Sequence, residues 1–137
     1  YGKELRLLQH LLDAGCEGRP AEVCEAIERF GDVVLGPSTS WLKVAGGEKA
    51  DALTAATRAS PPGGGILEVG AYCGYSAIRM AMAIPGVGVA SLEVDPVHVV
   101  IARNVVALAG LAHVAHIWTG HSKDLLPRWA VGQAPPF

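Results

Sequence analysis

One stretch of the chain, residues 66–76, combines a short apolar run, an acidic residue, two glycines and a final serine. The apolar run is typical of a strand, and helical apolar spacing follows Ser76, so the stretch predicts a strand, a tight turn and a helix start. A glycine-rich turn between a strand and a helix is where many α/β proteins bind nucleotide-like ligands. We therefore expect a ligand crevice at this turn.

The rest of the chain after residue 65 alternates between strand and helix patterns. We expect strands at 66–69, 87–92 and 113–118, and helices at 76–83, 97–109 and 122–126. Asp95 and Ser122 are the expected caps of the last two helices, and Ser76 of the first. The order strand, helix, strand, helix, strand predicts a parallel sheet with right-handed crossovers and the spatial order 3-2-1.

A Pro- and Gly-rich segment at residues 60–65 divides the chain into a helical front section, 1–60, and an α/β section, 61–137. Helical spacing in the front section predicts helices at 5–12, 20–30 and 48–59, the second ended by Gly31. The intervening loop, 36–47, carries Trp41, Leu42 and Val44. We expect these apolar residues to cover either the core or a bound ligand.

Composition excludes several classes of protein. Half of the 137 residues are hydrophobic and 18% are charged, which is typical of a folded globular chain. The net charge is −2 and no basic block is present, so nothing indicates nucleic-acid binding. No apolar run approaches the ~20 residues of a membrane-spanning helix. Three cysteines without a C-x-x-C pair favour a reducing compartment, and we expect the cytoplasm.

The expected sheet lacks half of a doubly wound arrangement. The first strand should be central in such a sheet, yet no later strand is predicted to pair with its other edge. The chain also begins with Tyr1 rather than Met. We therefore expect a single domain truncated at both ends, with the C-terminal half of the sheet absent.

The turn itself argues against a pyrophosphate ligand. A dinucleotide site needs G-x-G-x-x-G, whereas this chain has Gly70-x-x-x-Gly74 with the bulky Tyr72 between the glycines. Glu68, just before the turn, would also repel phosphate. A carboxylate at this position suits a cation such as an α-amino group or a sulfonium.

Two further positions complete the expected crevice. Glu93 ends the second strand, where an acid can accept hydrogen bonds from both ribose hydroxyls. Residues 120–123 follow the third strand, where an adenine ring could lie. A ligand with a ribose, an adenine and a cationic amino-acid tail is S-adenosylmethionine.

Residues 68–81, with the sequence EVGAYCGYSAIRMA, closely resemble motif I of the catechol O-methyltransferase family, which belongs to the class I S-adenosylmethionine-dependent methyltransferases. The similarity continues through 92–96, 109–110 and 120–127, and covers the front helices more loosely. The resemblance implies a Rossmann-like α/β fold in which this chain supplies the N-terminal helices and the first three parallel strands.

The resemblance also implies a role for each matching residue. The positions expected to bind the cofactor run from its methionine end, through its ribose, to its adenine. They are Val44, Glu68, Gly70, Tyr72 and Ser76 at the methionine end, Glu93 at the ribose diol, and Gly120, His121, Ser122 and Lys123 at the adenine. The dipole of the helix that starts near Ser76 favours a carboxylate there.

The activity implied by the resemblance is methyl transfer from S-adenosylmethionine to a hydroxyl of a catechol or related phenol. The family implies Mg²⁺, but its ligands and the catalytic lysine would follow Phe137, so we assign no catalytic or metal-binding residue within the chain. We expect residues 1–137 alone to bind the cofactor weakly or not at all and to transfer no methyl group. The whole protein is expected to act as a monomer on a small molecule.

Two alternatives remain open from the residues. One is a non-catalytic homologue that binds S-adenosylmethionine. The other is a nucleotide-binding oxidoreductase, which the spacing of Gly70 and Gly74 and the acid at Glu68 disfavour.

Overall fold

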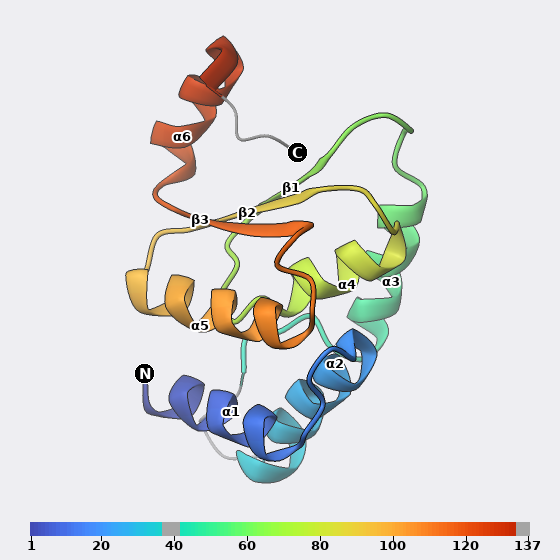
Figure 1. Cartoon of the computed structure of the whole chain (residues 1–137), viewed down its shortest axis with the longest axis vertical. Helices are drawn as coiled ribbons and strands as arrows, with labels where there is room; N and C mark the ends of the chain where they lie inside the picture. Colours follow the sequence, from blue (N-terminus) through green and yellow to red (C-terminus); the bar gives the residue numbers. More distant parts are fainter. Residues whose placement is uncertain (37–41, 134–137) are drawn as a thin grey trace.

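A three-stranded parallel sheet organises the fold in the computed structural model, which describes residues 1–36 and 42–133 (Figure 1). Its strands are β1 (Ile66–Val69), β2 (Val89–Glu93) and β3 (Ala115–Thr119). They are hydrogen-bonded in the order β1-β2-β3. The α/β class and the expected spatial order 3-2-1 are therefore confirmed.

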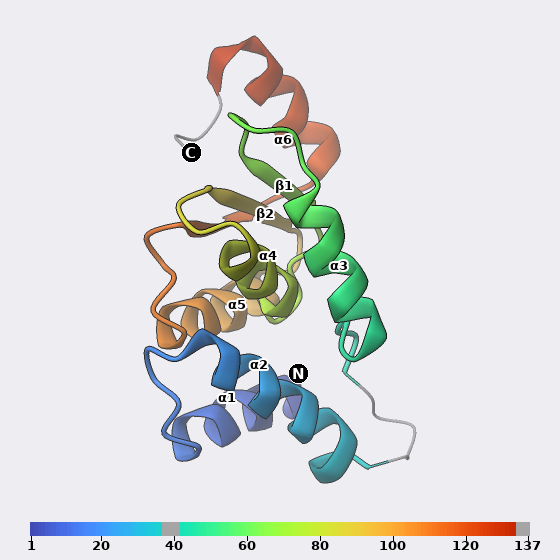
Figure 2. The same cartoon turned by 90° about the vertical axis from the view of Figure 1, so that its right-hand side faces the viewer.

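Helices cover one face of this sheet in two layers (Figures 1 and 2). The inner layer contains α4 (Tyr75–Ala83) and α5 (Pro96–Leu108), the crossover helices of the two βαβ units. The outer layer contains α1 (Gly2–Asp13) and α2 (Pro20–Arg29), which contact α5 and α4. Helix α3 (Glu48–Arg58) lies against α4 at the side of these layers (Figure 2).

Residues from the front section and the α/β section form one hydrophobic core. Leu7 and Ile27 from the outer helices are 0% exposed, as are Ile78 and Val105 from the inner helices. Full burial of each such side chain stabilises the fold by roughly 1.5–3 kcal/mol. The outer helices are therefore held firmly against the helices that follow β1 and β2.

The opposite face of β1 is open. Side chains alternate between the two faces of a strand, so Ile66 and Glu68 face the helices while Leu67 and Val69 face away. Leu67 is 46% exposed and Val69 is 64% exposed. Within the described residues, no strand pairs with the outer edge of β1.

The chain after β3 lies beyond the sheet, where α6 (Ser122–Arg128) continues into the π-helical turn η2 (Trp129–Gln133). Trp129 packs edge-on against Trp118 of β3, with ring centroids 5.8 Å apart. This contact covers part of the sheet face that the helices leave open.

Three predicted helix ends are wrong. Gly31 does not end the second helix, because α2 continues into the π-helical turn η1 (Phe30–Val34), where Phe30 is 1% exposed in the core. Ser122 does not cap α6; the N-cap is His121, and Ser122 is the first helical residue. Ser76 is not a cap either, since α4 starts at Tyr75 with Gly74 as its N-cap. The predicted Asp95 cap is confirmed, because its carboxylate accepts from the backbone N–H groups of α5.

Two predicted strands begin too early in the sequence. A turn occupies the start of the third strand, since the N–H groups of Val114 and Ala115 both bond to the carbonyl of Leu111, at 3.0 and 2.9 Å. The second strand starts at Val89 rather than at residue 87, because the N–H of Val87 closes a turn on Ile84.

Candidate functional site

The turn between β1 and α4 has an unusual backbone. Gly70, Tyr72 and Gly74 all have positive φ angles, of 95°, 50° and 83°. A Cβ on Gly74 would lie 3.2 Å from the carbonyl oxygen of Ala102, so the glycine lets the turn pack closely against α5. Tyr72 is the only described residue other than glycine with positive φ, and such strain concentrates at functional sites.

A half-buried carboxylate, that of Glu68, lies directly before this turn. The hydroxyl of Ser91, in the neighbouring strand β2, donates to Glu68 Oε2 at 2.6 Å. Burial raises the pKa of Glu68; hydrogen bonds from Ser91 and Ser76 oppose this rise, and the charge of Glu93 adds to it. A carboxylate that is costly to ionise in the free protein gains most from a cationic partner.

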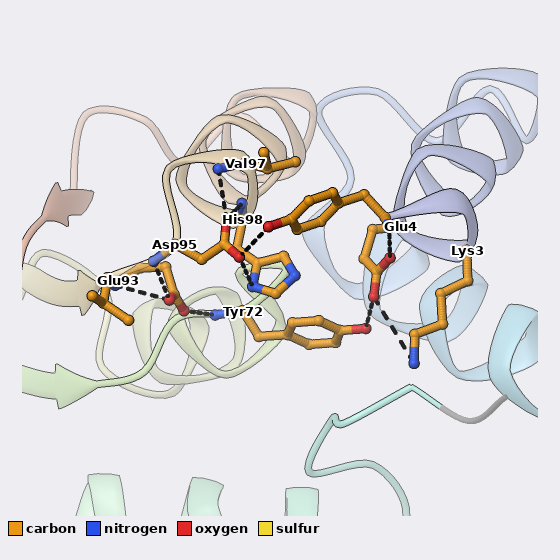
Figure 3. Close-up of polar contacts among 9 residues, drawn as sticks. Lys3, Glu4, Tyr72, Glu93, Asp95, Val97 and His98 are labelled. Carbon is orange, nitrogen blue, oxygen red and sulfur yellow. Dashed lines mark hydrogen bonds and ion pairs between the residues drawn. The ribbon is translucent and has the colours of Figure 1, made fainter. Parts of the chain in front are cut away.

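Glu93 is held rigidly at the end of β2 by three backbone N–H groups (Figure 3). Its Oε2 accepts from Tyr72 at 2.8 Å, and its Oε1 accepts from Val94 at 2.8 Å and from Asp95 at 3.0 Å. A carboxylate has about four acceptor positions, so Glu93 retains capacity for a further donor. The bond to Tyr72 also links the end of β2 to the turn after β1.

A cleft of about 140 Å³ lies at the carboxyl ends of the strands. The residues that line it come from the segments following all three strands. They are Val69, Gly70, Leu92, Glu93, Val94, Gly120, His121 and Ser122. The carboxyl edge of a parallel sheet is where α/β proteins bind ligands.

The structure thus brings together three groups of predicted site residues that are far apart in sequence: Gly70, Glu93, and the run Gly120, His121 and Ser122. Gly120 is held over the cleft by its N–H, which bonds to the carbonyl of Glu93 at 2.9 Å. Its φ of 146° is one that side chains rarely adopt, and a Cβ there would lie 3.0 Å from Leu125.

The other predicted site residues lie outside the walls of this cleft. Glu68 and Ser76 do not line the cleft, although the Ser76 side chain opposes the rise in the pKa of Glu68. Lys123 is exposed on the first turn of α6. Val44 lines a separate cavity of about 400 Å³ between its loop and the α2–η1 region. Trp41 lies outside the described residues, whereas Leu42 is 5% exposed and packs in the core.

Tyr72 points its ring toward helix α1 (Figure 3). Its hydroxyl donates to Glu4 Oε1 at 2.7 Å, and its ring packs edge-on against His98 with centroids 5.0 Å apart. Burial would raise the pKa of Glu4, but the bond from Tyr72, a backbone hydrogen bond and the charge of Lys3 together lower it. The backbone of Tyr72 bonds to Glu93, while its side chain anchors α1.

Sequence reasoning missed the partners of the predicted residues. Glu4 is 68 positions from Tyr72, and Ser91 is 23 positions from Glu68. A second contact to α1, from the Tyr1 hydroxyl to Asp95 Oδ2 at 2.7 Å, spans 94 positions. The one available signal was register, since Glu68 and Ser91 are paired residues on adjacent strands.

Comparison with known proteins now identifies the family. The sequence model of a family described as O-methyltransferase matches residues 62–136, which include the turn, the cleft and all three strands. The chain belongs to the O-methyltransferase family. The resemblance found in the sequence is thereby confirmed.

Individual members of the O-methyltransferase family extend the similarity to the front helices. The catechol O-methyltransferase of Bos taurus is 34% identical over 127 residues, covering 92% of this chain and 44% of the relative. That of Mus musculus is 35% identical over 127 residues, covering 92% of this chain and 46% of the relative. The chain therefore spans about half the length of these relatives.

Solved structures of O-methyltransferases show the same fold. The enzyme from Bacillus cereus, in complex with SAH, superposes with a TM-score of 0.63 at 24% identity, covering 85% of this chain and 51% of the other. An O-methyltransferase from Klebsiella pneumoniae superposes with a TM-score of 0.59 at 25% identity, covering 94% of this chain and 55% of the other. The Rossmann-like methyltransferase fold is thus confirmed.

Proposed function

We propose that this chain binds S-adenosylmethionine and forms the cofactor-binding part of an O-methyltransferase that acts on a hydroxyl of a catechol or related phenol. The observation that carries the proposal is the cleft lined by Glu93 and the glycine turn, with the half-buried Glu68 carboxylate directly before that turn and bonded to Ser91. An anionic pocket beside a Gly-rich turn suits a cationic ligand with a ribose. The names of the relatives and the SAH complex of a family member support the same reading.

Each part of the cofactor has partners in this proposal. Glu68 attracts the α-amino group, while Gly70, Tyr72, Ser76 and Val44 surround the methionine end. Glu93 accepts from the ribose diol with its remaining capacity. The adenine lies against Gly120, His121, Ser122 and Lys123, where the cleft is lined by the first three of these residues.

The bound cofactor would supply an electrophilic methyl group on its sulfonium. The contribution of this chain is binding and orientation, which account for much of the rate gain in transfers between bound groups. Three backbone N–H groups fix Glu93, and the core fixes α4, so the ribose and the methionine end would be held at set positions.

Magnesium belongs to the function implied by the family. Within residues 1–36 and 42–133, no group of three or more His, Cys, Asp or Glu side chains could hold a metal ion. The side chains of these segments therefore do not form a magnesium site by themselves. A small phenolic acceptor, a monomeric whole protein and a cytoplasmic location are the other parts of the proposal.

No helix in the described part of the chain combines the length and apolar character needed to cross a membrane.

The proposal is tested by titrating the chain with S-adenosylmethionine and, in parallel, with NAD. We expect weak binding of S-adenosylmethionine, and a loss of affinity of at least tenfold in Glu68→Gln, because the variant removes the negative charge proposed to attract the cationic tail. Lys123→Gln, at the exposed end of the site, serves as a milder control. Equal binding of both ligands, or an unchanged affinity in Glu68→Gln, would contradict the proposal.

A further inference from the structure

A hydrogen bond outside the crevice joins the start of α4 to helix α2. The hydroxyl of Tyr75, the first residue of α4, donates to Glu28 Oε1, and Tyr75 is only 1% exposed. Burial raises the pKa of Tyr75, and the hydrogen bond and charge of Glu28 raise it further. The tyrosine therefore stays protonated and remains a donor across the neutral pH range.

The same Glu28 side chain supports the loop that carries Val44. An ideal Cβ on Gly46 would lie 3.3 Å from Glu28 Cγ, so the loop backbone packs directly against the glutamate. Glu28, Val44 and Gly46 also line one cavity, of about 400 Å³. One carboxylate side chain thus contacts both the helix start and the loop.

The surroundings favour a strong bond between Glu28 and Tyr75. Cys24, one turn earlier on α2, is 1% exposed, and burial raises its pKa to about 12, so it adds no charge. Arg79 makes no hydrogen bond to this pair: its Nη2 lies 3.2 Å from Thr54 Oγ1 and 3.7 Å from Asp51, and its charge only partly offsets the rise in the pKa of Tyr75. The Tyr75 side chain is shielded from water, and a hydrogen bond in such a setting is stronger than one at the surface.

We propose that Glu28 is a positioning residue that fixes the spacing between the N-terminus of α4 and the loop at residues 44–47. This inference rests on the proposed function, in which Ser76 and Val44 approach the methionine end of the cofactor. Tyr75 directly precedes Ser76, and Gly46 follows Val44 by two residues. Loss of the link would let the loop move away from the helix and would weaken cofactor binding without removing any residue that touches the cofactor.

The first test uses the free protein. Backbone ¹⁵N order parameters of residues 44–47 are measured in wild type, Glu28→Ala, Glu28→Gln and Tyr75→Phe. We expect values near 0.85 in wild type and Glu28→Gln, whose amide oxygen can still accept, and values below about 0.6 in Glu28→Ala. Tyr75→Phe should lower them as well. Glu25→Ala, an exposed glutamate on the same helix, is the matched control.

The second test measures the dissociation constant of S-adenosylmethionine for the same proteins. We expect about tenfold weaker binding in Glu28→Ala and in Tyr75→Phe, and no further loss in the double variant, because both remove one link. Glu28→Gln should bind within about twofold of wild type. Gly46→Ala, which pushes a methyl group toward Glu28, gives a second perturbation should Glu28→Ala fold poorly.

These outcomes separate the inference from the proposed function. Unchanged order parameters in Glu28→Ala would overturn the positioning role, as would a Glu28→Gln variant that behaves like Glu28→Ala, since charge rather than the hydrogen bond would then matter. Absence of cofactor binding in wild type would overturn the proposed function, whereas the order parameters would still decide whether Glu28 holds the loop.

Discussion

At the residue scale, the ionised carboxylate of Glu68 should lower the stability of the folded protein. Its carboxyl is half-buried, and burial raises its pKa above the value of 4.5 expected in the unfolded chain, although the side chains of Ser91 and Ser76 oppose this rise. The native state therefore keeps the proton to a higher pH than the unfolded state does. The contribution of Glu68 to stability must fall as the pH rises from 4.5 through the folded pKa.

Glu68→Gln is consequently expected to stabilise the free protein at pH 7 by roughly 0.5–2 kcal/mol, the common range for single stabilising substitutions. This gain in the free energy of unfolding should shrink toward zero as the pH falls to 4.5, the pKa of Glu68 in the unfolded chain. Thermal unfolding between pH 4.5 and 7.5 measures both effects. A variant that is less stable than wild type at pH 7 would show that the half-buried carboxylate supports the fold.

Glu93→Gln should destabilise the fold, in contrast to Glu68→Gln, because the Glu93 carboxylate accepts from three backbone N–H groups. Glu93→Gln places an N–H₂ group where one oxygen was, leaving a backbone donor without its partner at a cost of roughly 1–3 kcal/mol. Denaturant unfolding should show the loss even without a ligand. Equal stability of the variant and wild type would mean that the turn rearranges freely.

At the scale of elements, the main result is that helix α1 is fastened to the turn after β1. Tyr72 reaches Glu4, and Tyr1 reaches Asp95 at the start of α5, with His98 between the two tyrosine rings (Figure 3). The helix is thus coupled to the turn that begins the cleft.

Tyr72→Phe tests this coupling. The variant keeps the ring but leaves the Glu4 carboxylate, only 5% exposed, without its hydroxyl donor, which should cost about 1–3 kcal/mol. Folding lowers the pKa of Glu4 below its ordinary value of 4.5. The stability that the Glu4 carboxylate contributes is therefore present above pH 4.5 and is lost as the pH falls through the pKa in the folded state. The difference between Tyr72→Phe and wild type should therefore narrow in acid.

Tyr1→Phe is the matched control, because Tyr1 is 60% exposed and its bond to Asp95 lies at the surface. Chemical unfolding at pH 7 and at pH 4 compares the three proteins. A loss in Tyr1→Phe as large as that in Tyr72→Phe would contradict the assignment of the anchor to Glu4.

Some elements could be predicted from the sequence, whereas others depend on tertiary packing. Apolar runs and glycines placed β1 correctly at Ile66–Val69, because local pattern and tertiary burial agree there. Gly31 failed as a helix end, since packing of Phe30 and Leu42 around it outweighs its weak helix propensity. Local pattern could single out the acidic residues and glycines at the ends of the strands as candidate site residues. The link from Tyr72 to Glu4 depends on tertiary packing, which no local pattern encodes.

At the scale of the whole molecule, one sheet face is covered by two layers of helices and the other is partly open. Leu67 and Val69 are exposed on the open side of β1, and such apolar strands favour association. We expect concentration-dependent self-association of residues 1–137.

Leu67→Lys should weaken this association roughly tenfold, because a Leu side chain that becomes buried contributes about 1.5–3 kcal/mol. Val100→Lys on α5 is the control, since Val100 is 58% exposed on a helix rather than on the open sheet. Sedimentation velocity at several concentrations measures the change. A monomeric wild type, or equal effects of both variants, would contradict the role of the open face.

The central claim is that the crevice at the carboxyl ends of the strands is built for a cationic adenosyl ligand. The most direct measurement is a ¹H–¹⁵N spectrum of the chain titrated with S-adenosylmethionine to millimolar concentration, with NAD as the parallel ligand. We expect weak binding that shifts the amides of Gly70, Glu93 and Gly120 together, with no comparable shifts from NAD. Shifts elsewhere only, none at all, or equal shifts from both ligands would contradict it.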